Sequence, residues 1–311
     1  MRMTRSIITA AAVALLAAGE TQAQNRLNVV ASTEDLASIA REVGGDRVNV
    51  TALARGYQDP HFVEPKPSFI LTVNRADLYV AVGRELEIGW LPPLITSSRN
   101  ARVQPGAAGY LDASLNVRIL EIPTGQITRA MGDVHPLGNP HYWLEPGNGR
   151  LIAQAIRNKL GELSPANRSY FGQRYDDFNA RLAAAEKRWD AAMAPHTGAK
   201  VVTYHRSWPN FMERFRLEVI GYVEPKPGIP PSPSHTLELI EEMKRQGVKF
   251  IVVEPYFSLR TPQAIASQIA GGRVLVLAPS VGGAKEVTDY IQLFDYNVNL
   301  LAGALKPVTG K

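Results

Sequence analysis

Six histidines are the residues of this 311-residue chain most able to do chemistry, because the sequence contains no cysteine. A chain without thiols can have no disulfide framework, no thiolate zinc site and no cysteine nucleophile. Any bound metal ion must therefore be held by imidazoles and carboxylates.

Three of the histidines stand where ligands would be expected. His61 ends an Asp-Pro-His motif after a β-rich run, His141 ends an Asn-Pro-His motif, and His205 directly follows another β-rich run. Loops at the carboxyl ends of strands in an open α/β sheet converge on the ligand crevice. A preceding proline also restricts the backbone and stiffens the loop. We therefore predict that the three imidazoles meet between two lobes.

Imidazole nitrogen suits zinc, whereas magnesium, calcium and manganese prefer oxygen ligands. Tetrahedral zinc needs a fourth donor or a water. Glu254 is the leading candidate, because it follows the β-rich run 250–253. Its alternative role is that of a supporting or hinge residue making a hydrogen bond or salt bridge. His135 lies close to His141 in sequence and could also contribute a ligand, although a position in a mobile loop is the favoured interpretation.

Two carboxylates are candidates for supporting the imidazoles. A ligating histidine usually donates its other ring N–H to a carboxylate or carbonyl, and Asp59 and Glu145 each lie close in sequence to a candidate ligand. The alternative for Glu145 is a charge at a helix N-terminus.

The chain alternates short β-rich runs with amphipathic stretches from residue 27 onward. This alternation predicts an α/β fold with mostly parallel sheets flanked by helices. Strands are expected at 27–31, 48–54, 78–82 and 117–122 in the first half, and at 200–204, 217–223, 248–253 and 273–277 in the second. Helices are expected at 34–43, 88–96, 207–215, 235–246, 262–270 and 288–304.

One long amphipathic helix is expected between the two series, over residues 164–195. Ser164 and Pro165 form its start signal, and apolar residues then recur at spacings of three, four or seven. A helix of this length spans roughly 40 Å and would connect two lobes rigidly. The expected organisation is an N-terminal lobe at 24–163, the connecting helix at 164–195 and a C-terminal lobe at 196–311.

Residues 1–23 have the pattern of a cleaved signal peptide, with Arg2 and Arg5 before the apolar run 7–18 and a small-residue site ending at Ala23. The run is shorter than the ~20 residues of a membrane span. Without a cysteine to carry lipid, the mature protein is expected to be free in a periplasm. The net charge of +5 comes with no basic block, which argues against nucleic-acid binding. Nothing in the sequence indicates an oligomer, so we expect a monomer.

These motifs together resemble a known family: the metal-binding components of ABC importers for zinc and manganese. The resemblance spans nearly the whole mature chain. It is carried by the following segments: Asp-Pro-His at 59–61 with Glu-Pro at 64–65 and Pro-Ser at 67–68, Asn-Pro-His-x-Trp-Leu-Glu-Pro at 139–146, Tyr-His at 204–205, Pro-Ser at 231–232, and Val-Glu-Pro at 253–255. It implies two α/β lobes joined by one long helix, with an ion held in the cleft and delivered to a membrane permease.

The resemblance also implies a ligand set. The family's first three ligand positions correspond to His61, His141 and His205, and histidine at the third is typical of zinc members, where manganese members carry glutamate. The family's usual fourth ligand, an acid, falls at Pro279-Ser280 here. Glu254, a water or another residue must then complete the site. The His-rich loop of zinc members is reduced to His135, which leaves room for a periplasmic metallochaperone.

Two classes of function therefore compete. The first is a zinc-binding component of an ABC importer, which is not an enzyme; manganese or iron is the alternative cargo. The second is a secreted zinc hydrolase, because three protein ligands plus a water also describe catalytic zinc. The sequence has no His-Glu-x-x-His and no Gly-x-Ser-x-Gly motif, although Glu254 could be read as a general base.

Overall fold

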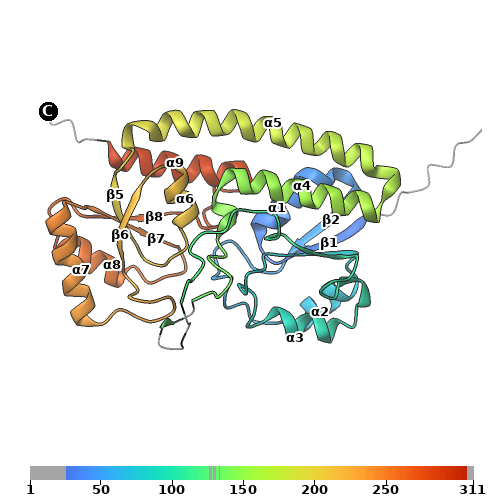
Figure 1. The fold of residues 1–311 in the computed structure, drawn as a ribbon, viewed down its shortest axis with the longest axis horizontal. Coiled ribbons are helices and arrows are strands. Elements are labelled where there is room, and N and C mark those ends of the chain that lie inside the picture. The colour runs from blue at the N-terminus through green and yellow to red at the C-terminus, as the bar shows by residue number, and fades with distance from the viewer. Residues whose placement is uncertain (1–25, 126–127, 129–130, 133, 307–311) are drawn as a thin grey trace, which may run out of the picture.

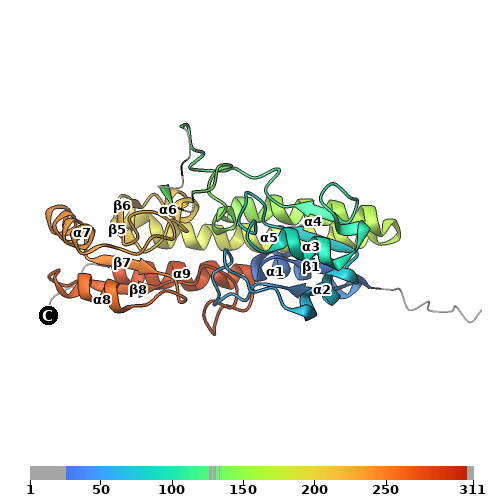
Figure 2. The same ribbon diagram turned by 90° about the horizontal axis from the view of Figure 1, so that it is seen from below.

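The computed structural model describes residues 26–125, 128, 131–132 and 134–306, and the predicted signal peptide lies outside these ranges. Two lobes lie side by side along the long axis, each built on its own parallel sheet (Figures 1 and 2). Within the described ranges, no helix has both the length and the apolar character needed to cross a membrane. The predicted α/β class with two sheet-based lobes is confirmed.

The N-terminal sheet has the strand order β2-β1-β3-β4, with every neighbouring pair parallel. All four residues of β3 are buried, as expected for a parallel strand covered by helices on both faces. The elements of this lobe are β1 (Leu27–Ala31), α1 (Glu34–Gly44), β2 (Val48–Ala52), α2 (Pro67–Asn74), β3 (Leu78–Ala81), α3 (Leu91–Ser98), β4 (Tyr110–Asp112) and α4 (Pro146–Leu163).

The C-terminal sheet repeats this topology in the order β6-β5-β7-β8, again with parallel pairs. Each predicted strand of this half is present, shortened by one or two residues. The elements are β5 (Lys200–Thr203), α6 (Pro209–Arg214), β6 (Glu218–Tyr222), α7 (Pro233–Gln246), β7 (Phe250–Val253), α8 (Arg260–Ser267), β8 (Arg273–Val276) and α9 (Tyr290–Leu305).

The strand expected at 117–122 is wrong. The fourth strand is β4, which pairs with β3 from Tyr79↔Tyr110 onward. Glu121 has a left-handed backbone with φ of 52°, which ends any extended run there. Val117 and Ile119 are half-buried against the core, so the apolar residues that suggested a strand are used to anchor a loop.

The long helix α5 (Arg168–Met193) has 26 residues and is about 39 Å long. The predicted start at residue 164 is four residues early, because Pro165–Asn167 forms a 3₁₀ turn before the α-helix begins. The helix runs along both lobes (Figure 1), packing on α1 and α4 at one end and on α9 at the other. It therefore braces the lobes from outside.

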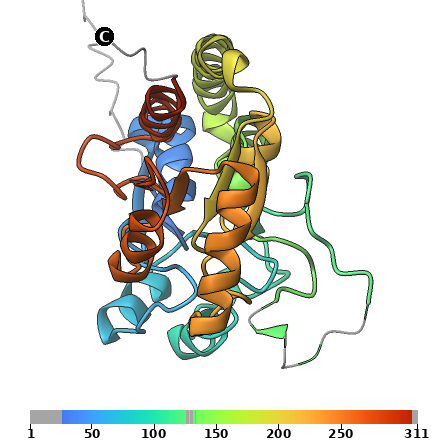
Figure 3. The same cartoon turned by 90° about the vertical axis from the view of Figure 1, so that its left-hand side faces the viewer.

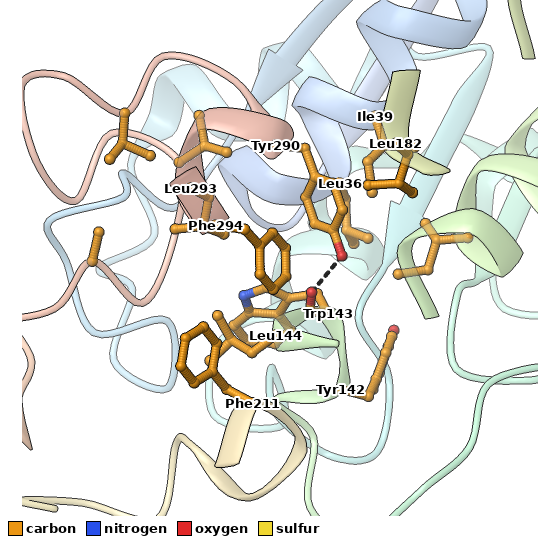
Figure 4. Close-up of a cluster of buried hydrophobic side chains, with 14 of the residues drawn as sticks. Leu36, Ile39, Tyr142, Trp143, Leu144, Leu182, Phe211, Tyr290, Leu293 and Phe294 are labelled. Atoms are coloured by element: carbon orange, nitrogen blue, oxygen red, sulfur yellow. Dashed lines mark hydrogen bonds between the residues drawn. The ribbon is translucent and has the colours of Figure 1, made fainter. Parts of the chain in front are cut away.

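The lobes also share a core, which Figure 4 shows around Tyr290 of α9. The Tyr290 hydroxyl donates a hydrogen bond of 2.5 Å to the backbone oxygen of Trp143. The indole of Trp143 in turn donates to the backbone oxygen of Pro279, 3.0 Å away. Both tryptophan and tyrosine are buried within one apolar cluster. The N-terminal and C-terminal halves are thus packed together rather than hinged.

A buried acid completes this junction. Asp35, in α1, accepts hydrogen bonds from the Ser280 hydroxyl (2.5 Å) and the Val281 backbone N–H (3.0 Å). Burial raises the pKa of Asp35 from 3.8 to about 7, despite the hydrogen bonds from Ser280 and Val281. The carboxyl therefore joins the lobes most favourably while it is protonated.

Asp35→Asn tests this junction. Between about pH 4 and 7 the folded chain holds a proton on Asp35 that the unfolded chain has released, so wild-type stability falls as the pH rises through this window. Asparagine imitates the neutral acid and avoids that loss. We expect the stability of the variant relative to wild type to be about 2 to 3 kcal/mol more favourable at pH 8 than at pH 5, measured by urea unfolding. Asp176→Asn, at an exposed position of α5, is the control; an equal difference at both pH values for Asp35→Asn would contradict the assignment.

Candidate metal centre

The structure brings three histidines together in the cleft. His61 follows β2, His205 follows β5, and His141 precedes the 3₁₀ turn Tyr142–Leu144 that leads into α4. One potential ligand atom from each lies within 4.8 Å of the other two. The ring centroids are 5.2 to 5.7 Å apart. Two imidazoles from the first lobe and one from the second therefore face a common point.

Each of the three rings is oriented by an oxygen at its Nδ1 atom. Carboxylate and amide oxygens only accept hydrogen bonds, so Nδ1 carries the proton and Nε2 keeps a lone pair when the ring is neutral. The pairs are His61 with Asp59 Oδ1 at 2.7 Å, His141 with Asn139 Oδ1 at 3.0 Å and His205 with Glu224 Oε2 at 2.7 Å. This is the usual arrangement around metal-ligating imidazoles.

The electrostatics of the site favour neutral imidazole at its centre. Burial, with the neighbouring His61 as a smaller cause, holds the pKa of His141 well below its usual range. The Nε2 atom of His141 is buried and has no hydrogen-bond partner among the described residues. An unpaired buried nitrogen is unfavourable, and a metal ion at the common point would satisfy it.

Asp59 provides the negative charge nearest to His61. Burial acts to raise its pKa, but the hydrogen bonds from His61 outweigh this and hold the pKa of Asp59 below its usual range. The carboxyl therefore remains ionised at neutral pH and fixes the ring of His61, as predicted.

Sequence reasoning missed Glu224 and Asn139 and misplaced Glu145. Glu224 comes two residues after the end of β6 and His205 two residues after the end of β5, and these two strands are paired, so the two residues are neighbours at the same edge of the sheet. A signal existed, because the tetrapeptide Glu-Pro-Lys-Pro occurs both at 64–67 and at 224–227. Glu145 instead caps α4 by accepting from the Asn148 N–H at 2.7 Å. The structure therefore shows the alternative role of Glu145, that of a charge at a helix N-terminus.

Glu254 lies outside the three-histidine group within the part of the chain that the structure describes. It is fully buried after β7, and its Oε1 atom accepts a 2.9 Å hydrogen bond from the Trp208 indole. Burial raises the pKa of Glu254 to about 8, which favours the neutral acid. Ligation by Glu254 stays a prediction, and these contacts favour its alternative role as a supporting residue.

A fourth histidine reaches the site. The Nε2 atom of His135 lies 3.1 Å from Nε2 of His61. Burial, together with the neighbouring His61 and His205, lowers the pKa of His135 to about 4, so this ring is neutral at pH 7. His135 belongs to the long segment between β4 and α4, the green chain that extends to one side of the lobes in Figure 3.

Two parallel-sheet lobes, a bracing helix and three imidazoles in the cleft define a two-lobed substrate-binding protein for a metal ion. The chain belongs to the family described as zinc-uptake complex component A, periplasmic, whose model matches residues 29–304.

Individual relatives agree with this assignment. The chain is 24% identical over 290 residues to the zinc-binding lipoprotein AdcA of Streptococcus pneumoniae, covering 90% of this chain and 56% of that protein, so it spans just over half of AdcA. It is 23% identical over 288 residues to the manganese ABC transporter substrate-binding lipoprotein PsaA of Streptococcus anginosus, covering 90% of this chain and 89% of that one. A solved zinc-bound ZnuA, deleted for 138–173 of its own sequence, superposes with a TM-score of 0.77 at 26% identity, covering 91% and 99% of the two chains.

Glu224→Gln tests the orienting hydrogen bonds. The neutral amide weakens the acceptor that fixes the His205 ring, and loss of such a partner typically lowers metal affinity 10- to 100-fold. We expect a loss of about tenfold in zinc affinity, measured by competition with a chromophoric chelator. Glu218→Gln is the matched control, because Glu218 of β6 is exposed and pairs with Lys200 of β5, 3.8 Å away, rather than with a histidine of the site. Equal affinities for the two variants would show that Glu224 does not support the site.

Proposed function

We propose that this protein is the periplasmic zinc-binding component of an ABC importer, with His61, His141 and His205 as metal ligands. The observation that carries the proposal is the shared orientation of the three rings: each Nδ1 is paired with an oxygen, and the three histidines offer ligand atoms to one point. The family match supports the same function. The cargo is bound and handed on, with no chemical step.

The donor set favours zinc over manganese. Three imidazoles suit zinc, whereas manganese prefers oxygen ligands. Relatives named for each metal match the chain, so the argument for zinc depends on the ligands, and above all on His205. Manganese and iron are the alternative cargoes, and the titration below compares zinc with manganese.

Delivery requires a membrane permease, and the predicted signal peptide with no cysteine fits a protein free in the periplasm. The shared core and α5 resist a large hinge motion, so release is expected through local movement of the ligand-bearing loops. The proposal also includes a monomeric protein. It further includes a periplasmic metallochaperone that supplies the zinc.

The proposal is tested by titrating the metal-free mature chain with zinc and manganese. We expect one zinc per chain, little displaced by manganese. We expect His61→Ala, His141→Ala and His205→Ala each to weaken zinc binding by about a hundredfold or more, because each removes a ligand and leaves an incomplete site. Isothermal titration in the presence of a competing chelator measures these changes.

Two further variants make the test specific. His235→Ala removes an imidazole that faces the Tyr222 backbone oxygen at 2.9 Å, and it should leave zinc affinity unchanged. Glu254→Ala should weaken binding as strongly as the histidine changes only if Glu254 is a ligand. Zinc binding that is indifferent to all three cleft histidines would overturn the proposed function.

A further inference from the structure

The geometry points to His135 as the fourth zinc ligand, recruited from the segment between β4 and α4. This inference rests on the proposed function and deepens it, since it completes the site that His61, His141 and His205 begin.

The distance between the His135 and His61 nitrogens is close to that expected for two ligands of one zinc ion. Two nitrogens bound to one tetrahedral zinc at 2.0 to 2.1 Å are roughly 3.3 Å apart. The two Nε2 atoms lie 3.1 Å apart. Because Nδ1 of His61 donates to Asp59, Nε2 of neutral His61 has a lone pair directed at His135. Without an ion the two rings share a proton at this contact, and zinc would take its place.

The backbone around His135 is anchored rather than free to swing. The Gly138 N–H donates to the His135 carbonyl at 3.1 Å, closing a turn. The next residue, Asn139, donates its N–H to the Leu120 carbonyl at 2.9 Å, which ties the turn to the returning chain. These bonds hold the backbone of the turn close to the site, so that only a short movement of the imidazole is needed to reach the ion.

The same segment touches the opposite lobe. A Cβ atom added at Gly132, where φ is 78°, would lie 2.3 Å from the Pro227 carbonyl oxygen. Only a glycine allows the chain to approach the C-terminal lobe so closely. Asn139 also donates its side-chain N–H to the Arg206 carbonyl, 2.8 Å away. Gly132 and Asn139, on either side of His135 in the sequence, thus both contact the C-terminal lobe.

The cavities around the site place His135 at its entrance. One cavity is lined by His135 together with His141 and His205, and a second is lined by His135 together with His61. The imidazole therefore stands between two openings to the cleft. His135 is not part of the group whose ligand atoms lie within 4.8 Å of one another, so binding has to draw its ring a short way inward.

The other candidates for the fourth position are less well placed. Glu254 lies outside the three-histidine group, and its Oε1 atom accepts from the Trp208 indole. The residue at the family's acidic position, Ser280, donates its hydroxyl to Asp35. A water would complete the tetrahedron equally well chemically, and the experiment must distinguish it from an imidazole.

X-ray absorption at the zinc edge makes that distinction, because multiple scattering from imidazole rings reports their number. We expect four imidazoles in the wild-type chain loaded with one zinc, and three plus an oxygen in His135→Ala. The variant should still bind one zinc, with an affinity lowered about tenfold or more in chelator competition. Leu137→Ala is the matched control, since it truncates an exposed side chain two residues away in the same turn; it should match wild type in both measurements.

Two results would contradict the inference, and they differ in what they overturn. Three imidazoles plus an oxygen in the wild type, with an unchanged affinity in His135→Ala, would exclude His135 as a ligand and leave the three-histidine site intact. A wild-type chain that binds no zinc, or binds it without the cleft histidines, would instead refute the proposed function itself.

Discussion

The packing of the two lobes into one core is the constraint on which the metal centre depends. His61 and His141 come from the first lobe and His205 from the second, so the distances between them are only as precise as the lobe junction. A functional constellation must be held within about 0.5 Å of its working geometry. The junction around Trp143 meets this need, because its indole and its carbonyl are both hydrogen-bonded to the C-terminal half. The helix α5 reinforces this junction from outside.

Within this frame, the rings are oriented before any ion arrives. The oxygens of Asp59, Asn139 and Glu224 fix three Nδ1 atoms, and the entropy of ordering the ligands is therefore spent during folding. The same arrangement leaves the buried Nε2 atom of His141 without a hydrogen-bond partner among the described residues. A nitrogen that folding leaves buried without a partner raises the free energy of the metal-free state, and ligation removes that penalty.

Much of this architecture follows from local sequence patterns. Alternating β-rich and amphipathic runs predict seven of the eight strands, because parallel strands covered on both faces have continuous apolar runs. The strand β4 was not predicted, because it has only three residues and all are half-buried. The more apolar run at 117–122, which suggested a strand, is a loop anchored in the core. The role of Glu224 depends on which strands are neighbours in the sheet, and that information is not contained in any single segment. The proximity of His135 to His61 likewise depends on the path of a long loop, which no local pattern predicts.

The rigid frame also limits how the ion can leave. Opening the cleft by a hinge would separate Asp35 from Ser280 and Trp143 from Pro279, breaking buried hydrogen bonds and exposing apolar surface. Each buried donor or acceptor left unpaired costs about 1 to 3 kcal/mol. Movement of the segment that carries His135 breaks fewer buried contacts, since its links to the C-terminal lobe include the partly exposed ion pairs Arg118–Glu213 and Glu121–Arg206. If His135 is the fourth ligand, displacing the turn that carries it would remove one ligand, while Asp59 and Glu224, which lie outside this segment, still held the rings of His61 and His205. The rigidity that makes capture precise thus directs release to the loop.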